Sequence, residues 1–288
     1  MIPAIDTYAW HRYGGFHYPD IESRPELQLT LIDMIGRAQS MGAKGIALES
    51  CFLPDFDPAR LDDIRSALKE TGLVPAWSSG HPRGLESGAS EEGLNDILRE
   101  IPVARSVGAN VMRICAGGRG SRPERWEDHR AALLPMLVRA AEAAAGEGVV
   151  LAIENHLDLF ADELAELVER VDSQALGVCF DTANNLRMGE DPVEVARKLI
   201  PHTRMTHVKD ISPWPGGTSS FSAWPSVPLG RGQAQSATVL RMLMDAGYDG
   251  LLALEIDFLH PECGCADEDE ALAIGLAELE RMLIAATV

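Results

Sequence analysis

Short apolar runs rich in β-branched residues recur at regular intervals along the whole chain. Their continuous apolar character, as in residues 149–153, is typical of parallel strands that are covered on both faces. Segments with helical spacing separate them, and a glycine precedes several of the runs, as at Gly72 and Gly148. We expect eight strands, at residues 4–10, 45–50, 73–78, 111–116, 150–155, 177–181, 204–208 and 251–256.

Eight alternating strand and helix units predict a (β/α)₈ TIM barrel that spans residues 1–288 as a single domain. An open doubly wound sheet would more often carry a glycine-rich phosphate fingerprint after its first strand, and residues 8–11 are Tyr-Ala-Trp-His instead. No linker rich in proline, glycine or serine divides the chain. The longest irregular stretch, residues 212–232, follows the seventh strand, where a barrel has its active-site rim.

The formal net charge of −19 argues against partners with anionic surfaces, because no run of lysine and arginine offsets it. We therefore expect neither a nucleic acid nor a membrane as partner. The first residues lack the basic and apolar regions of a signal peptide, and no segment approaches the roughly 20 apolar residues of a membrane span. Five cysteines, an odd number, favour a reducing compartment, so the expected location is cytoplasmic.

Four late strands each change from apolar residues to metal-ligand chemistry at the carboxyl end. These residues are Glu154, Asp181, His207 and Glu255. Barrel closure brings the ends of separate strands around one axis, so we expect the four side chains to meet. Any one of them alone has the simpler interpretation of a capped or salt-bridged residue at a strand end.

Three carboxylates and an imidazole in one barrel mouth would repel one another unless a cation neutralised them. The sequence therefore predicts one divalent metal ion. Oxygen ligands with one nitrogen favour Mn²⁺ or Mg²⁺, and Co²⁺, Fe²⁺ or Zn²⁺ stay as alternatives. Such an ion acts as a Lewis acid that stabilises an enediolate.

With these residues the chain resembles the xylose isomerase-like TIM barrels, the sugar phosphate isomerase/epimerase superfamily. The resemblance covers nearly the whole chain and rests on the motifs IENH at 153–156, FDTANN at 180–185, THVKD at 206–210, LGRG at 229–232, and YDG at 248–250 leading to Glu255. As a set, the motifs are specific for the superfamily and unspecific for the reaction.

The resemblance implies that Glu154, Asp181, His207 and Glu255 are the metal ligands, and that Glu154 and Glu255 act as acid and base on a sugar or sugar acid. The implied activity is that of an isomerase or epimerase. The alternative is a lyase, either a decarboxylase of an oxidised sugar acid such as 3-oxo-isoapionate or a keto-acid dehydratase. Two departures favour this alternative: Asn184 stands where ketose 3-epimerases have a histidine, and Pro213 where they have an arginine.

Other polar residues near the expected upper rim are candidates for substrate contact, and a structural role is an equal alternative for each. The candidates are His11, His81, Arg113, His156, Asn184, Lys209 and Arg231. Lys209 has a further interpretation as the partner of Asp210 or of a ligand carboxylate. Trp10, Trp77, Trp214 and Trp224 are expected to stack on a sugar, and core packing or a dimer contact is an equal alternative for each.

Two other function classes are weaker interpretations. An abasic-site endonuclease, also found in this superfamily, needs more histidine ligands and a basic surface, whereas this chain has eight histidines and a strong negative charge. A non-catalytic carbohydrate-binding barrel would not need both Glu154 and Glu255. The expected partner is a small-molecule sugar or sugar acid, with a homo-oligomer left open.

Overall fold

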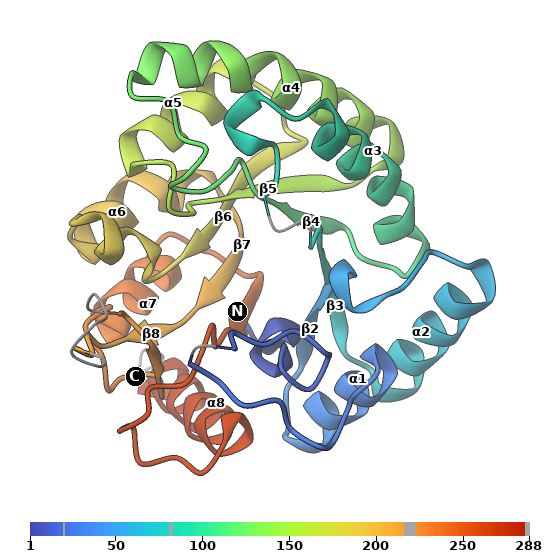
Figure 1. Cartoon of the computed structure of the whole chain (residues 1–288), viewed down its shortest axis with the longest axis vertical. Coiled ribbons are helices and arrows are strands. Elements are labelled where there is room, and N and C mark those ends of the chain that lie inside the picture. The colour runs from blue at the N-terminus through green and yellow to red at the C-terminus, as the bar shows by residue number, and fades with distance from the viewer. Residues whose placement is uncertain (20, 81–82, 216–222, 286–288) are drawn as a thin grey trace.

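The computed structural model describes residues 1–19, 21–80, 83–215 and 223–285. Eight parallel strands close into a barrel in the order β1-β10-β7-β6-β5-β4-β3-β2, and helices surround it (Figure 1). The predicted TIM barrel is confirmed. The barrel strands are β1 (Ile2–Asp6), β2 (Gly45–Glu49), β3 (Val74–Ser78), β4 (Val111–Ile114), β5 (Val150–Glu154), β6 (Leu176–Asp181), β7 (Thr203–Val208) and β10 (Leu251–Leu254).

The long helices follow the strands in alternation and form the outer layer (Figure 1). They are α1 (Leu31–Ser40), α2 (Pro58–Thr71), α3 (Glu91–Ser106), α4 (Trp126–Glu147), α5 (Ala161–Val171), α6 (Pro192–Leu199), α7 (Ser236–Asp245) and α8 (Glu268–Ala285). Gly72 and Gly148 end α2 and α4 in the left-handed conformation, with φ of 70° and 67°, which a residue without Cβ adopts most readily.

The strands bury both faces, as the continuous apolar runs predict. Residues of small volume alternate along them and pack in a cluster of their own inside the barrel, including Ala4, Ala47, Ala152 and Ala253. Larger neighbours such as Ile5 belong to the cluster between strands and helices. This alternation follows from the two-residue period of a strand.

The first strand ends earlier than the sequence pattern predicts. We expected residues 4–10, but β1 stops at Asp6 and a 3₁₀ turn, η1 (Thr7–Trp10), follows. The turn forms because Oδ1 of Asp6 accepts the backbone N–H of Tyr8 at 2.7 Å, which caps the turn. Asp6 thus becomes the last residue of a barrel strand.

Helix α8 closes the barrel against β1 and β10. Its first turn holds Glu268 and Asp269, which pair with Arg12 and Arg37 of the β1–α1 region. Acidic residues also suit the positive end of the helix dipole. None of the helices that the structure describes has the length and apolar character needed to cross a bilayer.

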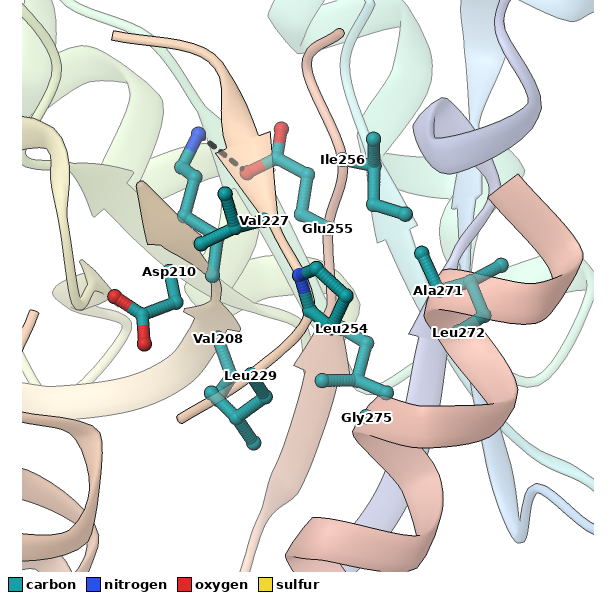
Figure 2. A pocket seen from close by; sticks show the side chains of 12 residues that line it. Val208, Asp210, Val227, Leu229, Leu254, Glu255, Ile256, Ala271, Leu272 and Gly275 are labelled. Carbon is teal, nitrogen blue, oxygen red and sulfur yellow. Dashed lines mark ion pairs between the residues drawn. The ribbon is translucent and has the colours of Figure 1, made fainter. Parts of the chain in front are cut away.

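Alternating residues at the end of β10 point to opposite sides. Figure 2 shows Leu254 directed toward Gly275 of α8, beside a cavity of about 10 Å³, and Glu255 directed the other way. A Cβ at position 275 would lie 2.9 Å from Cδ1 of Leu254, so glycine lets α8 approach the barrel. Packing on one side of β10 therefore aims Glu255 into the barrel mouth.

The stretch 212–232 is less irregular than expected. It is preceded by β8 (Asp210–Ile211), which pairs antiparallel with β9 (Ser226–Val227). Residues 216–222 lie outside the described residues. The two short strands fix the connection beside the barrel mouth, next to the carboxyl end of β7.

Candidate metal centre

Four side chains from separate strand ends meet at the carboxyl end of the barrel. Glu154 ends β5, Asp181 ends β6, His207 lies near the end of β7, and Glu255 follows β10. One ligand atom from each lies within 4.8 Å of the others. All four are buried, with exposed fractions between 0% and 7%. The sequence-predicted ligand set is therefore brought together in space.

Local hydrogen bonds orient the carboxylate of Asp181. Its Oδ1 accepts the backbone N–H groups of Ala183 and Asn184, both at 2.8 Å. The side chain of Asn155 donates to the backbone oxygen of Asp181 and accepts its N–H. These bonds leave Oδ2 free of hydrogen-bond partners, 3.0 Å from the ammonium of Lys209.

The ring of His207 has carboxylates on both sides. Nδ1 lies 3.2 Å from Oε2 of Glu255 and 3.7 Å from Oε1 of Glu154, whereas Nε2 lies 3.2 Å from Oδ2 of Asp6. A carboxylate beside Nε2 favours the proton on that nitrogen and leaves Nδ1 as the ligand atom. Asp6, which sequence reasoning missed, is thus placed to orient the imidazole.

The donor set fits a divalent cation. Nδ1 of His207, Oδ2 of Asp181 and Oε2 of Glu255 converge there without a hydrogen bond of regular geometry, and Lys209 is paired with both of these oxygens. Such atoms cost free energy when nothing compensates them. Three carboxylates and one imidazole match the preference of Mg²⁺ or Mn²⁺ for oxygen ligands with one nitrogen.

Lys209 is a buried cation within this cluster. Its Nζ lies 3.0 Å from Asp181, 2.9 Å from Glu255 and 2.8 Å from Asp257, and Figure 2 marks the pair with Glu255 by a dashed line. The sequence left two partners open for Lys209, Asp210 or a ligand carboxylate. The structure shows that Lys209 contacts the ligand carboxylates. Asp210 instead accepts backbone N–H groups of the 230–234 loop.

A second buried cation, Arg113, lies beside Glu154. Its guanidinium pairs with Glu49, donates to the carbonyl of Ser79 at 3.0 Å, and places Nε 3.4 Å from Oε2 of Glu154. Burial raises the pKa of Glu49 to about 8, although Arg113 opposes that shift. The arginine therefore holds two carboxyl groups at the barrel mouth.

The carboxylates have different electrostatic surroundings. Burial raises the pKa of Glu154, but His207 and Arg113 more than offset it, so the pKa lies below its ordinary value. Burial likewise raises the pKa of Asp181, to about 6, against the opposing effect of Lys209. Nδ2 of Asn184 donates to Oε1 of Glu154 at 3.0 Å, and this hydrogen bond also favours the ionised form of Glu154.

A cavity of about 770 Å³ opens above the cluster. Among the sequence-predicted substrate residues, those that line it are His11, Arg113, His156, Asn184 and Lys209. Arg231 is exposed and is not among the lining residues. His81 lies outside the described residues.

Asp257 and Arg187 are charged residues that also line the cavity, and neither was predicted. Asp257 pairs with Lys209 and, at 2.6 Å, with Arg187. Asp257 lies two residues after Glu255, a spacing that places both on one side of an extended chain and was a usable signal. The tryptophans Trp10 and Trp77 are fully buried, so they belong to the core.

Comparison with known proteins shows the family of this chain. The family model described as xylose isomerase-like TIM barrel matches residues 35–280. Uncharacterized protein YihM of Escherichia coli is 26% identical over 194 residues, which are 65% of this chain and 56% of YihM. The 3-oxo-isoapionate decarboxylase of Pectobacterium atrosepticum is 24% identical over 74% of this chain and 70% of its own length. An inosose dehydratase of Bacillus thuringiensis is 22% identical over 50% and 52%.

Solved structures share the whole fold. A xylose isomerase-like TIM barrel protein from Mycobacterium smegmatis in complex with magnesium has a TM-score of 0.73 and 18% identity, covering 100% of this chain and 98% of that one. A D-psicose 3-epimerase in the presence of D-fructose has a TM-score of 0.74 and 18% identity, with 98% and 99% covered. At this identity the likeness shows the fold alone.

Proposed function

Because the chain belongs to the xylose isomerase-like TIM barrel family, we propose that it is a divalent-metal-dependent isomerase or epimerase of a sugar or sugar acid. One observation carries the proposal: ligand atoms of Glu154, Asp181, His207 and Glu255 lie within 4.8 Å of one another beneath a cavity of about 770 Å³. The magnesium complex of the similar barrel supports Mg²⁺ as a candidate, beside Mn²⁺.

Glu154 and Glu255 are the proposed acid and base. Both line the cavity, and they approach the reacting carbon from different strands, β5 and the end of β10. One carboxylate takes a proton from the carbon and the other returns it, so the configuration or the carbonyl position changes. When bound, the divalent ion supplies Lewis-acid stabilisation of the enediolate.

The cations and amides of the wall have separate proposed roles. Arg113 holds Glu154 in place, and Asn184 donates to the same carboxylate. His11 and His156 line the cavity and are proposed to bind substrate hydroxyl groups. Lys209 is proposed to bind an anionic or carbonyl oxygen of the substrate.

A lyase is the second candidate, and two observations favour it. The similar decarboxylase covers 74% of this chain, and Asn184 donates to Glu154 at a position where a histidine would bind a ketose. Loss of carbon dioxide from an oxidised sugar acid leaves the same kind of enediolate as proton removal does. The same site therefore suits either reaction.

Incubation of the metal-loaded protein with keto sugars and oxidised sugar acids tests the proposal. Incorporation of solvent deuterium without gas supports isomerisation, and release of carbon dioxide supports the lyase. Glu154→Gln and Asp181→Asn are expected to abolish turnover, and Glu92→Gln on the exposed start of α3 is the control. Normal turnover by the first two variants would remove the proposed mechanism.

A further inference from the structure

The outer wall of the substrate cavity is mainly apolar, unlike its floor. Three residues of the β1–α1 connection, Phe16, Tyr18 and Ile21, line the cavity and expose 47%, 41% and 46% of their surface. They are three of the eight large apolar side chains that the described residues expose. Leu157 and Phe258 extend the wall at other strand ends. Exposed apolar residues gathered in this way usually mark a binding site.

This wall is held in place by polar contacts behind it. Oε2 of Glu22 accepts the backbone N–H of Tyr18 at 3.1 Å and lies 2.9 Å from Nε2 of His11. The hydroxyl groups of Tyr8 and Tyr18 lie 2.6 Å apart, and the ring of Phe16 packs edge-on against Phe52. The apolar side chains are therefore presented to the cavity by a braced segment.

The cavity is larger than a single sugar ring requires. Its volume of about 770 Å³ falls in the upper half of the range of about 300 to 1,000 Å³ that holds drug-sized ligands. The charged groups lie at the floor, around Glu154 and Lys209, so a sugar bound there leaves the outer part free. Phe16 and Ile21 offer that part no hydrogen bond, and His17 is a polar residue between them in the lining. A mainly apolar group therefore suits the outer part better than a second sugar ring.

We propose that the substrate is a sugar that carries a carbonyl group, as enediolate formation requires, and an apolar, ring-containing substituent; a keto derivative of an aryl glycoside is the simplest case. The inference rests on the proposed function, because the sugar end is placed at the metal centre. The apolar substituent then contacts Phe16, Ile21 and Phe258, and burying it removes apolar surface of both partners from water.

Calorimetric titration of the full-length, Mg²⁺-loaded protein tests the proposal. The probes are D-glucose and D-galactose, their methyl β-glycosides, and their phenyl β-glycosides. We expect at least one phenyl glycoside to bind about tenfold more tightly than its methyl counterpart, because only the phenyl ring reaches the wall. Equal or weaker binding of both phenyl glycosides overturns the proposal.

Matched variants separate the wall from other apolar surface. Phe16→Ala and Ile21→Ala are expected to reduce the phenyl preference to about threefold or less. Phe160→Ala is the control, because Phe160 is also an exposed aromatic residue but does not line the cavity. A preference that survives both wall variants overturns the proposal.

Sedimentation velocity tests a second copy of the chain as the occupant of the wall. A change in oligomeric state in Phe16→Ala with no change in the phenyl preference would assign the wall to self-association and overturn the proposal. The titration needs no turnover. A phenyl preference in the titration, with no deuterium exchange or gas release from the keto sugars and sugar acids, counts against the proposed function alone. Turnover of those compounds without a phenyl preference counts against this inference alone.

Discussion

Nε2 of His207 lies 3.2 Å from Oδ2 of Asp6, and both side chains are fully buried. A carboxylate behind a ligand imidazole fixes its tautomer and orientation, and its loss typically lowers metal affinity by about 10- to 100-fold. We therefore predict a loss of that size in Asp6→Asn, measured by titration with Mn²⁺. Asp191→Asn, which changes a helix-capping aspartate away from the site, should leave the affinity unchanged. Unchanged affinity in Asp6→Asn would show that Asp6 does not orient the ligand.

Lys209 competes with a metal ion for the same carboxylates, because its Nζ lies 3.0 Å from Asp181 and 2.9 Å from Glu255. Lys209→Met should lower the melting temperature of the metal-free protein, since these carboxylates then repel one another without compensation. The same change should raise metal affinity by about tenfold, because the ion no longer meets a neighbouring positive charge.

Thermal unfolding with EDTA and with excess Mg²⁺ measures both effects of this substitution. The gain in melting temperature on adding the ion should be larger in Lys209→Met than in the unmodified protein. Lys198→Met, at a partly exposed lysine that is paired with Asp162 away from the metal site, is the control. A smaller gain would mean that Lys209 supports metal binding instead of opposing it.

Local chemistry explains how much of this site could be predicted. Glu154 and Asp181 each interrupt an apolar run at its last position, and barrel closure alone then brings strand ends together. Asp6 has the same position on β1, but the apolar residues of η1 continue the pattern beyond it. The pattern therefore predicts a strand that reaches Trp10, in which Asp6 is an interior residue.

Loop conformation accounts for what the sequence could not provide. Arg231 belongs to a family motif, yet the fold of its loop depends on backbone N–H groups of Gly230 and Gly232 that bind Asp210. That arrangement leaves the arginine exposed. No residue pattern specifies such a side-chain direction, because it follows from tertiary hydrogen bonds and not from a strand or helix period.

The buried pair of Arg113 and Glu49 gives a stability prediction. Removing one member of a buried ion pair leaves an uncompensated charge and costs about 3–5 kcal/mol. Arg113→Met should therefore lower the free energy of unfolding by about that amount, measured by urea denaturation at pH 9, above the pKa of about 8 that Glu49 has in the fold. The double variant Arg113→Met with Glu49→Gln should recover part of the loss, because Glu49 is then no longer an unpaired charge. Recovery stays partial because Glu154 still loses its contact with Arg113. Strictly additive losses would contradict this coupling.

His129 provides a prediction for the pH dependence of stability. The ring is fully buried at the start of α4, 3.7 Å from Asp158, and burial together with Arg122 lowers its pKa to about 4. The unfolded chain takes up this proton below about pH 6.5, whereas the folded chain does so only near pH 4. His129 therefore destabilises the fold increasingly as the pH falls through that window.

His129→Phe removes this proton uptake and keeps a flat ring against Trp126. We compare the unfolding free energy of the variant with that of the unmodified protein at pH 7.5 and at pH 4.5. On lowering the pH, the variant should gain on the order of 2 kcal/mol relative to the unmodified protein. Burial raises the pKa of Asp158 to about 6. Asp158 therefore stabilises the fold as the pH falls, opposite to His129, because the folded chain protonates this carboxyl at a higher pH than the unfolded chain does. Asp158 is present in both proteins, so its contribution cancels when their unfolding free energies are subtracted. Urea denaturation at pH 7.5 and pH 4.5 therefore measures the contribution of His129. A difference that does not vary with pH would mean that the folded and unfolded states protonate this ring alike.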